Sequence, residues 1–250
     1  MKAPNRSRFP ARPIRAARLL TGHRRSATGD TALATLLAGI AGAANAGGFF
    51  ALGQYTSHMT GYLSQLADNV AILNLKIAAI SALAIAAFVA GAAFSTLLIN
   101  WARQHDGRQQ YALPLAVQGG LMACFAAGGL LTTEAGRLFA LACLCFTMGM
   151  QNATITKLSG ARIRTTHATG MITDIGIELG RAGFGLLHRH SGVAANGAKL
   201  KALLLLTFAF IAGGITGAVG YGVMGFLFSL PLAGLLLAIS LPAMIGRPQR

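Results

Sequence analysis

Two short polar segments carry the residues of this chain that could do chemistry. Residues 56–61 read Thr-Ser-His-Met-Thr-Gly, and residues 165–170 repeat the pattern as Thr-Thr-His-Ala-Thr-Gly. A histidine titrates near neutral pH and can carry a proton or bind a substrate. Threonine hydroxyls donate and accept hydrogen bonds, and glycine permits a helix break or a close approach. The candidate site residues in these segments are His58, Thr60, Gly61, His167, Thr169 and Gly170.

An asparagine motif precedes each of these segments. Residues 42–46 and residues 149–153 both read Gly-x-x-Asn-Ala. A buried asparagine amide offers two donors and an acceptor, so Asn45 and Asn152 could clamp unwound backbone or a ligand. Of these two roles we favour the structural one. Because both motifs recur together, the sequence predicts two homologous halves, residues 31–132 and 138–245.

Carboxylates follow the second histidine at helical spacing. Asp174 and Glu178 stand seven and eleven residues after His167, a spacing that returns to nearly the same face of a continuous helix. The first half has amide side chains at the equivalent positions. Acids in one half and amides in the other suit proton coupling, with Asp174 or Glu178 carrying the coupling charge. An ion pair between Glu178 and Arg181 is the structural alternative.

The composition indicates that lipid is the natural solvent of these segments. Hydrophobic residues make up 54% of the 250 residues and charged residues 11%, whereas a soluble domain carries about 25% charged residues. We therefore predict an all-α integral membrane protein with about six transmembrane helices and two polar, broken or re-entrant segments, residues 56–75 and 165–187. The six apolar runs, each long enough or nearly so to span a bilayer, are residues 31–52, 77–101, 111–132, 138–155, 200–224 and 225–245.

The net charge of +15 does not indicate a nucleic-acid partner. Eight of the 21 Lys and Arg residues lie in the first 25 positions, and most of the others lie between apolar runs. This is how membrane proteins distribute cytoplasmic charge. We expect residues 1–30 to form a basic, disordered cytoplasmic leader and residues 246–250 to form a cytoplasmic tail.

The flanking charge distinguishes two topologies. If the polar segments do not cross the bilayer, six spans place eleven bases beyond the leader inside and two, Lys76 and Arg137, outside. If they do cross, eight spans place eight bases inside and five outside. The positive-inside rule favours six spans. The two halves would then have opposite orientations, as in many secondary transporters, whereas eight spans would give parallel repeats.

The paired motifs resemble those of a known family. Residues 49–61, and residues 149–153 followed by 164–170, resemble the YoaK family of bacterial inner-membrane proteins, and the resemblance covers about residues 31–245. It implies a polytopic protein of the bacterial inner membrane, and it implies no substrate or reaction. The chain departs from the family at Asn45, where an acid is usual, and at Tyr62, where an asparagine is usual. The first departure argues against any mechanism that needs a carboxylate from the first span.

Three functions are compatible with these residues. The leading hypothesis is a small-solute transporter or permease in which the histidines contact the substrate or a proton. Transport coupled to protons is one form of this hypothesis. The second is a membrane-embedded enzyme that acts on a lipid or quinone, with His167 and Asp174 as acid–base partners. The third is a non-catalytic scaffold in which the motifs serve helix packing. Membrane lipids are the expected partners, a small-molecule substrate follows from the first hypothesis, and neither a cofactor nor a metal site is predicted.

Overall fold

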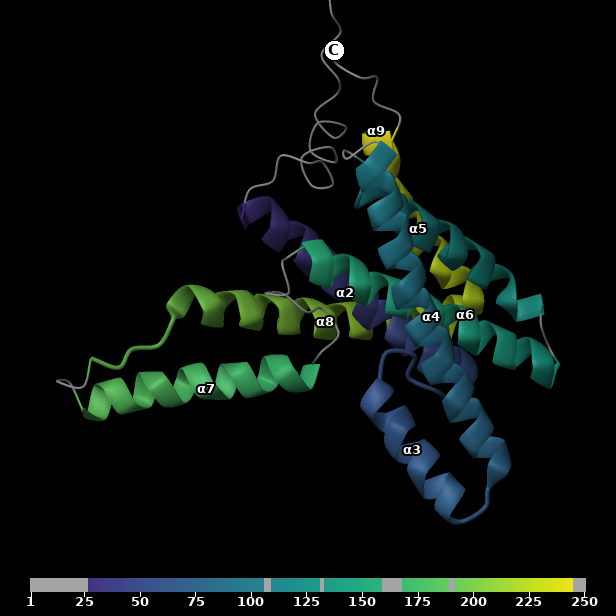
Figure 1. Ribbon diagram of the computed structural model, residues 1–250, viewed down its shortest axis with the longest axis horizontal. Coiled ribbons are helices and arrows are strands. Elements are labelled where there is room, and N and C mark those ends of the chain that lie inside the picture. Colours follow the sequence, from purple (N-terminus) through teal and green to yellow (C-terminus); the bar gives the residue numbers. More distant parts are fainter. Residues whose placement is uncertain (1–26, 106–108, 131–132, 159–167, 189–191, 245–250) are drawn as a thin grey trace, which may run out of the picture.

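The computed structural model describes residues 27–105, 109–130, 133–158, 168–188 and 192–244. Within these ranges the chain forms helices and no strand, so the all-α prediction is confirmed (Figure 1). The predicted tail, His167 and nearly all of the predicted leader lie outside the described residues. In chain order the elements are α2 (Ala27–Leu52), α3 (Met59–Ala71), α4 (Leu75–His105), α5 (Ala112–Ala126), η1 (Ala127–Leu130), α6 (Glu134–Leu158), α7 (Ala168–Leu187), α8 (Gly197–Met224), η2 (Gly225–Phe228) and α9 (Ser229–Met244).

Four helical stretches are long and apolar enough to cross a membrane. They are Gly29–Phe50, Leu75–His105, Glu134–Leu158 and Gly197–Met244, the last of which joins α8, η2 and α9. Length and composition therefore support a membrane protein, and the number of six spans stays a prediction. One predicted boundary agrees with the structure, since α8 ends at Met224 and η2 begins at Gly225, where φ is +56°.

The helices α5 and α9 are shorter than the apolar runs that predicted them. The run 111–132 is helical only to Ala126, and its last turns tighten into η1. The tightening accompanies close packing, because the Phe125 and Phe226 rings lie 5.0 Å apart and a Cβ on Gly128 would come within 2.8 Å of Phe226. With rises of about 1.5 Å and 2.0 Å per residue, α5 with η1 extends about 30 Å. This length matches the hydrocarbon thickness of a bilayer.

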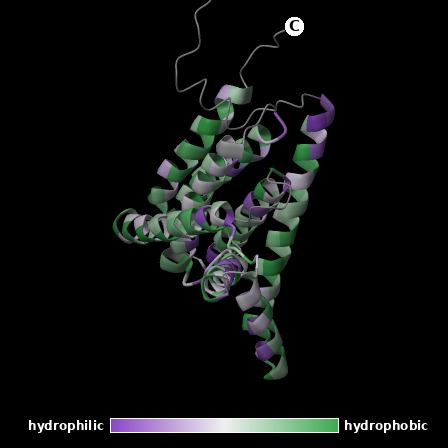
Figure 2. Ribbon diagram, turned by 90° about the vertical axis from the view of Figure 1, so that its left-hand side faces the viewer, coloured by the Kyte–Doolittle hydropathy of each residue, from purple (hydrophilic) through white to green (hydrophobic). Residues whose placement is uncertain are grey.

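The apolar side chains are distributed as lipid contact requires. In an apolar 18-residue window of each stretch, 61% is buried inside the protein in α2 and 67% in α6. Only 22% is buried in α4 and in the α8–α9 stretch. The peripheral helices expose large hydrophobic side chains such as Leu97, Phe208 and Val223, and the hydrophobic colour runs along most of the ribbon in Figure 2. Exposed apolar surface on this scale is unusual for a soluble monomer. It suits helices that face lipid.

Glycines set the closest helix contacts. At the α2–α8 contact, a Cβ on Gly42 would overlap the Phe210 carbonyl oxygen, and one on Gly213 would overlap that of Gly39. Where apolar surface is already solvated by lipid, helices associate through such close backbone packing. The α4–α6 contact has the same form, with Gly149 against the Phe88 carbonyl and Gly91 against that of Phe146.

A fully buried polar network joins α4, α5 and α6. The hydroxyls of Ser95 and Thr154 lie 2.9 Å apart, and the Gln118 Nε2 donates to the Thr154 oxygen at 3.2 Å. All three side chains have no exposed surface. Since a buried polar group without a partner is costly, this network favours one arrangement of the three helices.

The two polar segments form helices of different length. α3, with 13 residues, extends only about 20 Å and forms a hairpin with α4 (Figure 1). α7 lies along α8 and runs without a break from Ala168 to Leu187. The break that the motif glycines permit does not occur at Gly61 or Gly170, because both lie inside the first turns of α3 and α7. A helical glycine costs only about 1 kcal/mol, which neighbouring residues offset.

Candidate functional site

Asn45 connects the two motifs of the first half. α2 ends at Leu52, and the chain turns back so that both the backbone N–H and the hydroxyl of Ser57 donate to the Asn45 Oδ1, at 3.1 and 2.9 Å. The asparagine thus satisfies non-helical backbone between α2 and α3. Backbone groups outside a helix need such a partner where water is excluded. This geometry fits the structural role predicted for Asn45.

The turn between α2 and α3 depends on glycines. Gly53 adopts a φ of +71° and donates its N–H to the Phe49 carbonyl at 2.8 Å, a conformation that favours glycine. A Cβ on Gly48 would come within 2.6 Å of the Thr56 methyl, so the returning chain packs directly on α2. The rings of Phe49 and Tyr55 stack 4.9 Å apart and close the outer side of the turn.

His58 sits at the start of α3 with its ring against Gly61. It is the N-cap residue of α3, and a Cβ on Gly61 would overlap the imidazole. The histidine is exposed and borders a pocket of about 190 Å³, whose other lining residues are Gln54, Tyr55, Gly61, Tyr62 and Gln65. Of the predicted residues, this pocket includes His58 and Gly61. Thr60 is exposed beside it and does not line it.

The helix α3 is anchored on its inner face. The Ser81 hydroxyl of α4 donates to the Gln65 Oε1 at 2.8 Å, and Tyr62 is buried. The two amide residues seven and eleven positions after His58 are Gln65 and Asn69, and only Gln65 lines the pocket of His58. The Asn69 amide instead donates to the Gln65 carbonyl at 2.7 Å. Gln54, Tyr55 and Tyr62 were not predicted as site residues, since their position depends on how the turn folds.

The second half does not repeat this pocket among its described residues. Thr169 and Gly170 are exposed at the start of α7, the Thr169 carbonyl accepts from the Thr173 hydroxyl at 2.9 Å, and a Cβ on Gly170 would meet nothing within 4 Å. Asn152 is buried on α6, with 7% of its surface exposed. His167, the counterpart of His58, lies outside the described residues.

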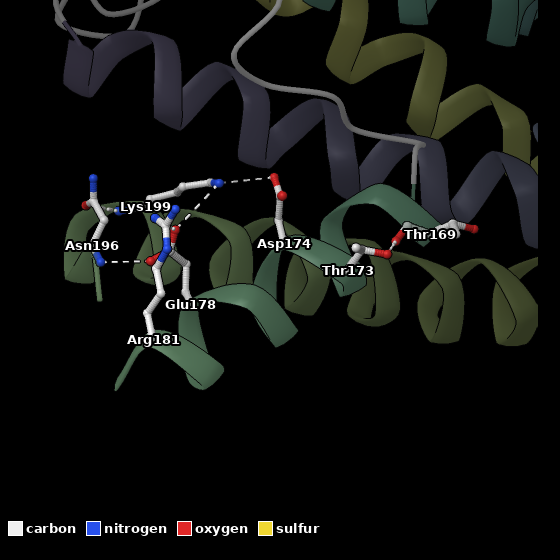
Figure 3. A network of polar contacts seen from close by, with 7 residues as sticks. All are labelled: Thr169, Thr173, Asp174, Glu178, Arg181, Asn196 and Lys199. Carbon is white, nitrogen blue, oxygen red and sulfur yellow. Dashed lines mark hydrogen bonds and ion pairs between the residues drawn. The ribbon is translucent and has the colours of Figure 1, made fainter. Parts of the chain in front are cut away.

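The two predicted acids take part in an ion-pair cluster between α7 and α8 (Figure 3). Glu178 has no exposed surface, and its Oε1 lies 3.4 Å from an Arg181 Nη and 3.6 Å from the Lys199 Nζ. Lys199 also pairs with Asp174 at 3.4 Å. The structural alternative, an ion pair from Glu178 to Arg181, is thus present. Glu178 and Asp174 face cations of α7 and α8, and neither lines the His58 pocket.

Glu178 also completes the N-terminal cap of α8. The Asn196 side chain accepts from the Lys199 N–H at 3.0 Å, and the Asn196 N–H donates to the Glu178 Oε2 at 2.8 Å. In a capping box both bonds come from one helix; here the carboxylate comes from α7. The asparagine before α8 is a recognisable cap signal, but sequence spacing does not identify a distant acid as its partner.

These contacts define the chemistry that the site can perform. An exposed imidazole beside two amides and the exposed phenol of Tyr55 can hold a small polar solute or exchange a proton with it. Across the described ranges, no cluster of three or more His, Cys, Asp or Glu has the arrangement of a metal site. Hydrogen bonding and proton exchange are therefore the chemistry that these residues offer.

The described residues define a class: a helical protein whose long apolar helices are of membrane-spanning length, with a polar pocket at a helix turn. The chain belongs to the family described as "Protein of unknown function (DUF1275)", whose model matches residues 33–241. No curated protein and no solved structure matches the chain. The match does not name the YoaK family, so that resemblance stays a prediction, and the function has to be argued from the geometry.

Proposed function

We propose that the protein is a multi-pass transporter or permease for small solutes in a bacterial inner membrane, with a cytoplasmic N-terminus. The observation that carries this proposal is the clamp of Asn45 on Ser57. It holds non-helical backbone beside apolar helices and presents His58 to a pocket lined by polar groups. Substrate sites of secondary transporters are commonly built where a membrane helix is interrupted in this way.

Contacts at the helix ends separate the flanking bases into two groups; eight spans would give the same groups with the sides exchanged, so six spans rest on the larger group lying inside. At one end the Arg103 Nε donates to the Gln110 Oε1 at 3.3 Å, and the Tyr111 hydroxyl donates to the Lys157 carbonyl. At the other end Lys76 pairs with Glu134 at 2.6 Å. The first end carries bases that six spans place inside, and the second carries one of the two placed outside. This separation is what the positive-inside rule requires.

The glycine contacts support a duplicated and inverted pair of halves. Gly42 and Gly149 occupy the same position of the Gly-x-x-Asn-Ala motif, and each packs on a backbone carbonyl of the third helix of the other half, at Phe210 and Phe88. Gly213 and Gly91 make the reciprocal contacts. We propose that each half therefore contributes its first helix to the packing of the other, as interlocked repeats do.

Roles follow for the remaining candidate residues. His58 contacts the substrate or its proton, and Thr60 offers a hydroxyl next to it. Thr169, exposed at the start of α7, is proposed to offer the equivalent hydroxyl in the second half, where Gly170 leaves open space. Asp174 and Glu178, which the sequence suggested as coupling charges, are proposed to hold α7 on α8 instead, because both carboxylates are engaged by Lys199.

The test is uptake by purified protein reconstituted in liposomes. We expect saturable uptake of at least one member of a broad panel of small solutes, and loss of that uptake in His58→Ala. His188→Ala is the matched control, since His188 is also exposed and stacks on Phe184. No saturable uptake of any solute, or equal uptake by the two variants, would contradict the proposal.

No contact in the described structure favours the enzyme hypothesis. Its acid–base pair needs Asp174 to be available to a histidine, and the Asp174 carboxylate lies 3.4 Å from the Lys199 Nζ. A scaffold would tolerate His58→Ala without any change in phenotype, so the uptake experiment separates it from a transporter.

A further inference from the structure

A second, larger pocket lies next to the His58 pocket. Its volume is about 480 Å³, within the range of roughly 300–1,000 Å³ that is usual for small-molecule sites. Gln54 lines both pockets, so it lies between them. The apolar part of the larger pocket comes from Leu52, Ile80, Leu138 and Leu141, and its polar part comes from Gln54, Glu134 and Arg137.

The charged side of this pocket is positive. Glu134 is paired with Lys76 at 2.6 Å, with both side chains mostly exposed. Such an exposed pair adds little stability, yet it compensates the charge of the one acid that lines the pocket. Arg137 has no acid within ion-pair distance among the described residues. Arg137 also acts electrostatically on Glu134, so two bases face one acid and one net positive charge remains beside an apolar wall. A guanidinium binds carboxylates through two parallel N–H donors.

We propose that this pocket binds an aliphatic monocarboxylate, with the carboxylate on Arg137 and the hydrocarbon chain along the four apolar side chains. Gln54 donates a further hydrogen bond to the carboxylate from its amide. A dicarboxylate fits less well, because its second charge would lie against leucine and isoleucine side chains. An aliphatic cation also fits less well, because its charge would be repelled by Arg137. A charged head on a short apolar chain matches both sides of the pocket.

This assignment rests on the proposed function, because it names the substrate class of the proposed transporter. Lys76 and Arg137 are the two bases that six spans place outside. The pocket then opens on the outer face, and Gln54 connects it to His58. An anion would bind at Arg137 before it reaches the imidazole.

Equilibrium binding of labelled octanoate to the full chain in phosphatidylcholine nanodiscs tests this inference, with empty nanodiscs as the blank. We expect saturable binding that weakens about tenfold or more in Arg137→Gln, since a charge-assisted pair is lost. Arg137→Lys should bind with intermediate affinity. Arg103→Gln, at the opposite end of the protein, should bind as the wild type does. Affinity should rise about fourfold for each methylene buried between acetate and octanoate.

Several results would overturn the inference. Equal binding by Arg137→Gln and the wild type is one, and equal competition by octylammonium is another. Saturable binding of phosphatidylglycerol that is lost in Arg137→Gln, together with no saturable octanoate binding, would assign the pocket to a lipid headgroup. Octanoate binding without any uptake would contradict the transport proposal alone. Uptake of another solute without octanoate binding would contradict this inference alone.

Discussion

The Oδ1 atom of Asn45 accepts two hydrogen bonds from Ser57, one from its backbone N–H at 3.1 Å and one from its hydroxyl at 2.9 Å. The two residues belong to separate sequence motifs, and their contact fixes the turn that carries His58 to the end of α2. One side-chain atom thereby links the helix-packing motif of the first half to its candidate site.

Replacing Asn45 removes the acceptor of both bonds. We expect Asn45→Ala to lower the free energy of unfolding by about 1–3 kcal/mol, because two donors lose their partner. Asn45→Asp retains an acceptor oxygen, as in the family that this motif resembles, and should stay within about 1 kcal/mol of the wild type. Unfolding by sodium dodecyl sulfate in mixed micelles measures both. An Asn45→Ala variant as stable as the wild type would show that the clamp contributes nothing.

The motif glycines should differ in their response to alanine. A Cβ on Gly61 would overlap the His58 ring, whereas one on Gly170 would meet nothing within 4 Å. Because His58 is exposed and can move, we expect Gly61→Ala to change stability by less than about 1 kcal/mol while displacing the imidazole and reducing uptake. Gly170→Ala should retain uptake. Equal uptake by the two variants would argue against a role for the His58 position.

The glycine contacts between helices predict a larger effect on stability. In α8, Gly213 packs against the Gly39 carbonyl, while Gly222 has nothing within 4 Å of its missing Cβ. Gly213→Ala should destabilise the protein by about 1–3 kcal/mol, because the two helices must move apart. Gly222→Ala, on the same helix, should change the free energy of unfolding by less than about 0.5 kcal/mol. Similar values for the two would contradict the packing.

The α7–α8 cluster predicts unequal roles for its two acids. Glu178 is buried, caps α8 and faces two cations, so Glu178→Ala should cost about 3 kcal/mol. Asp174 is 42% exposed, so Asp174→Asn should cost less than about 1 kcal/mol. Hydrogen exchange of the amides in the first turn of α8 should be faster in Glu178→Ala only. Equal exchange rates in the two variants would rule out the shared cap.

Local chemistry made much of this fold predictable. Apolar composition places the helices correctly, and the end of α8 at Met224 coincides with Gly225, whose φ of +56° ends the helix. Asn45 was predicted to clamp unwound backbone or a ligand, because a buried amide offers two donors and an acceptor. These predictions depend on neighbours in sequence.

Long-range packing decided the rest. The pairing of Asp174 and Glu178 with Lys199 depends on α8 lying beside α7, and no periodicity within α7 reveals that neighbour. The role of Gln54 in both pockets depends on a turn whose shape is set by contacts such as Gly48 with Thr56. Neither is encoded in residue spacing.

The central claim is the inverted six-span arrangement, which places the end of α3 and the start of α6 outside and Gln104 inside. Single cysteines at Ala71, Gln104 and Ala135, all exposed, test it in a protein in which Cys124, Cys143 and Cys145 are replaced by alanine. A membrane-impermeant thiol reagent is added to intact cells. Six spans predict labelling of Ala71→Cys and Ala135→Cys and protection of Gln104→Cys. Labelling of Gln104→Cys, with protection of the other two, would establish eight spans and contradict the inverted arrangement.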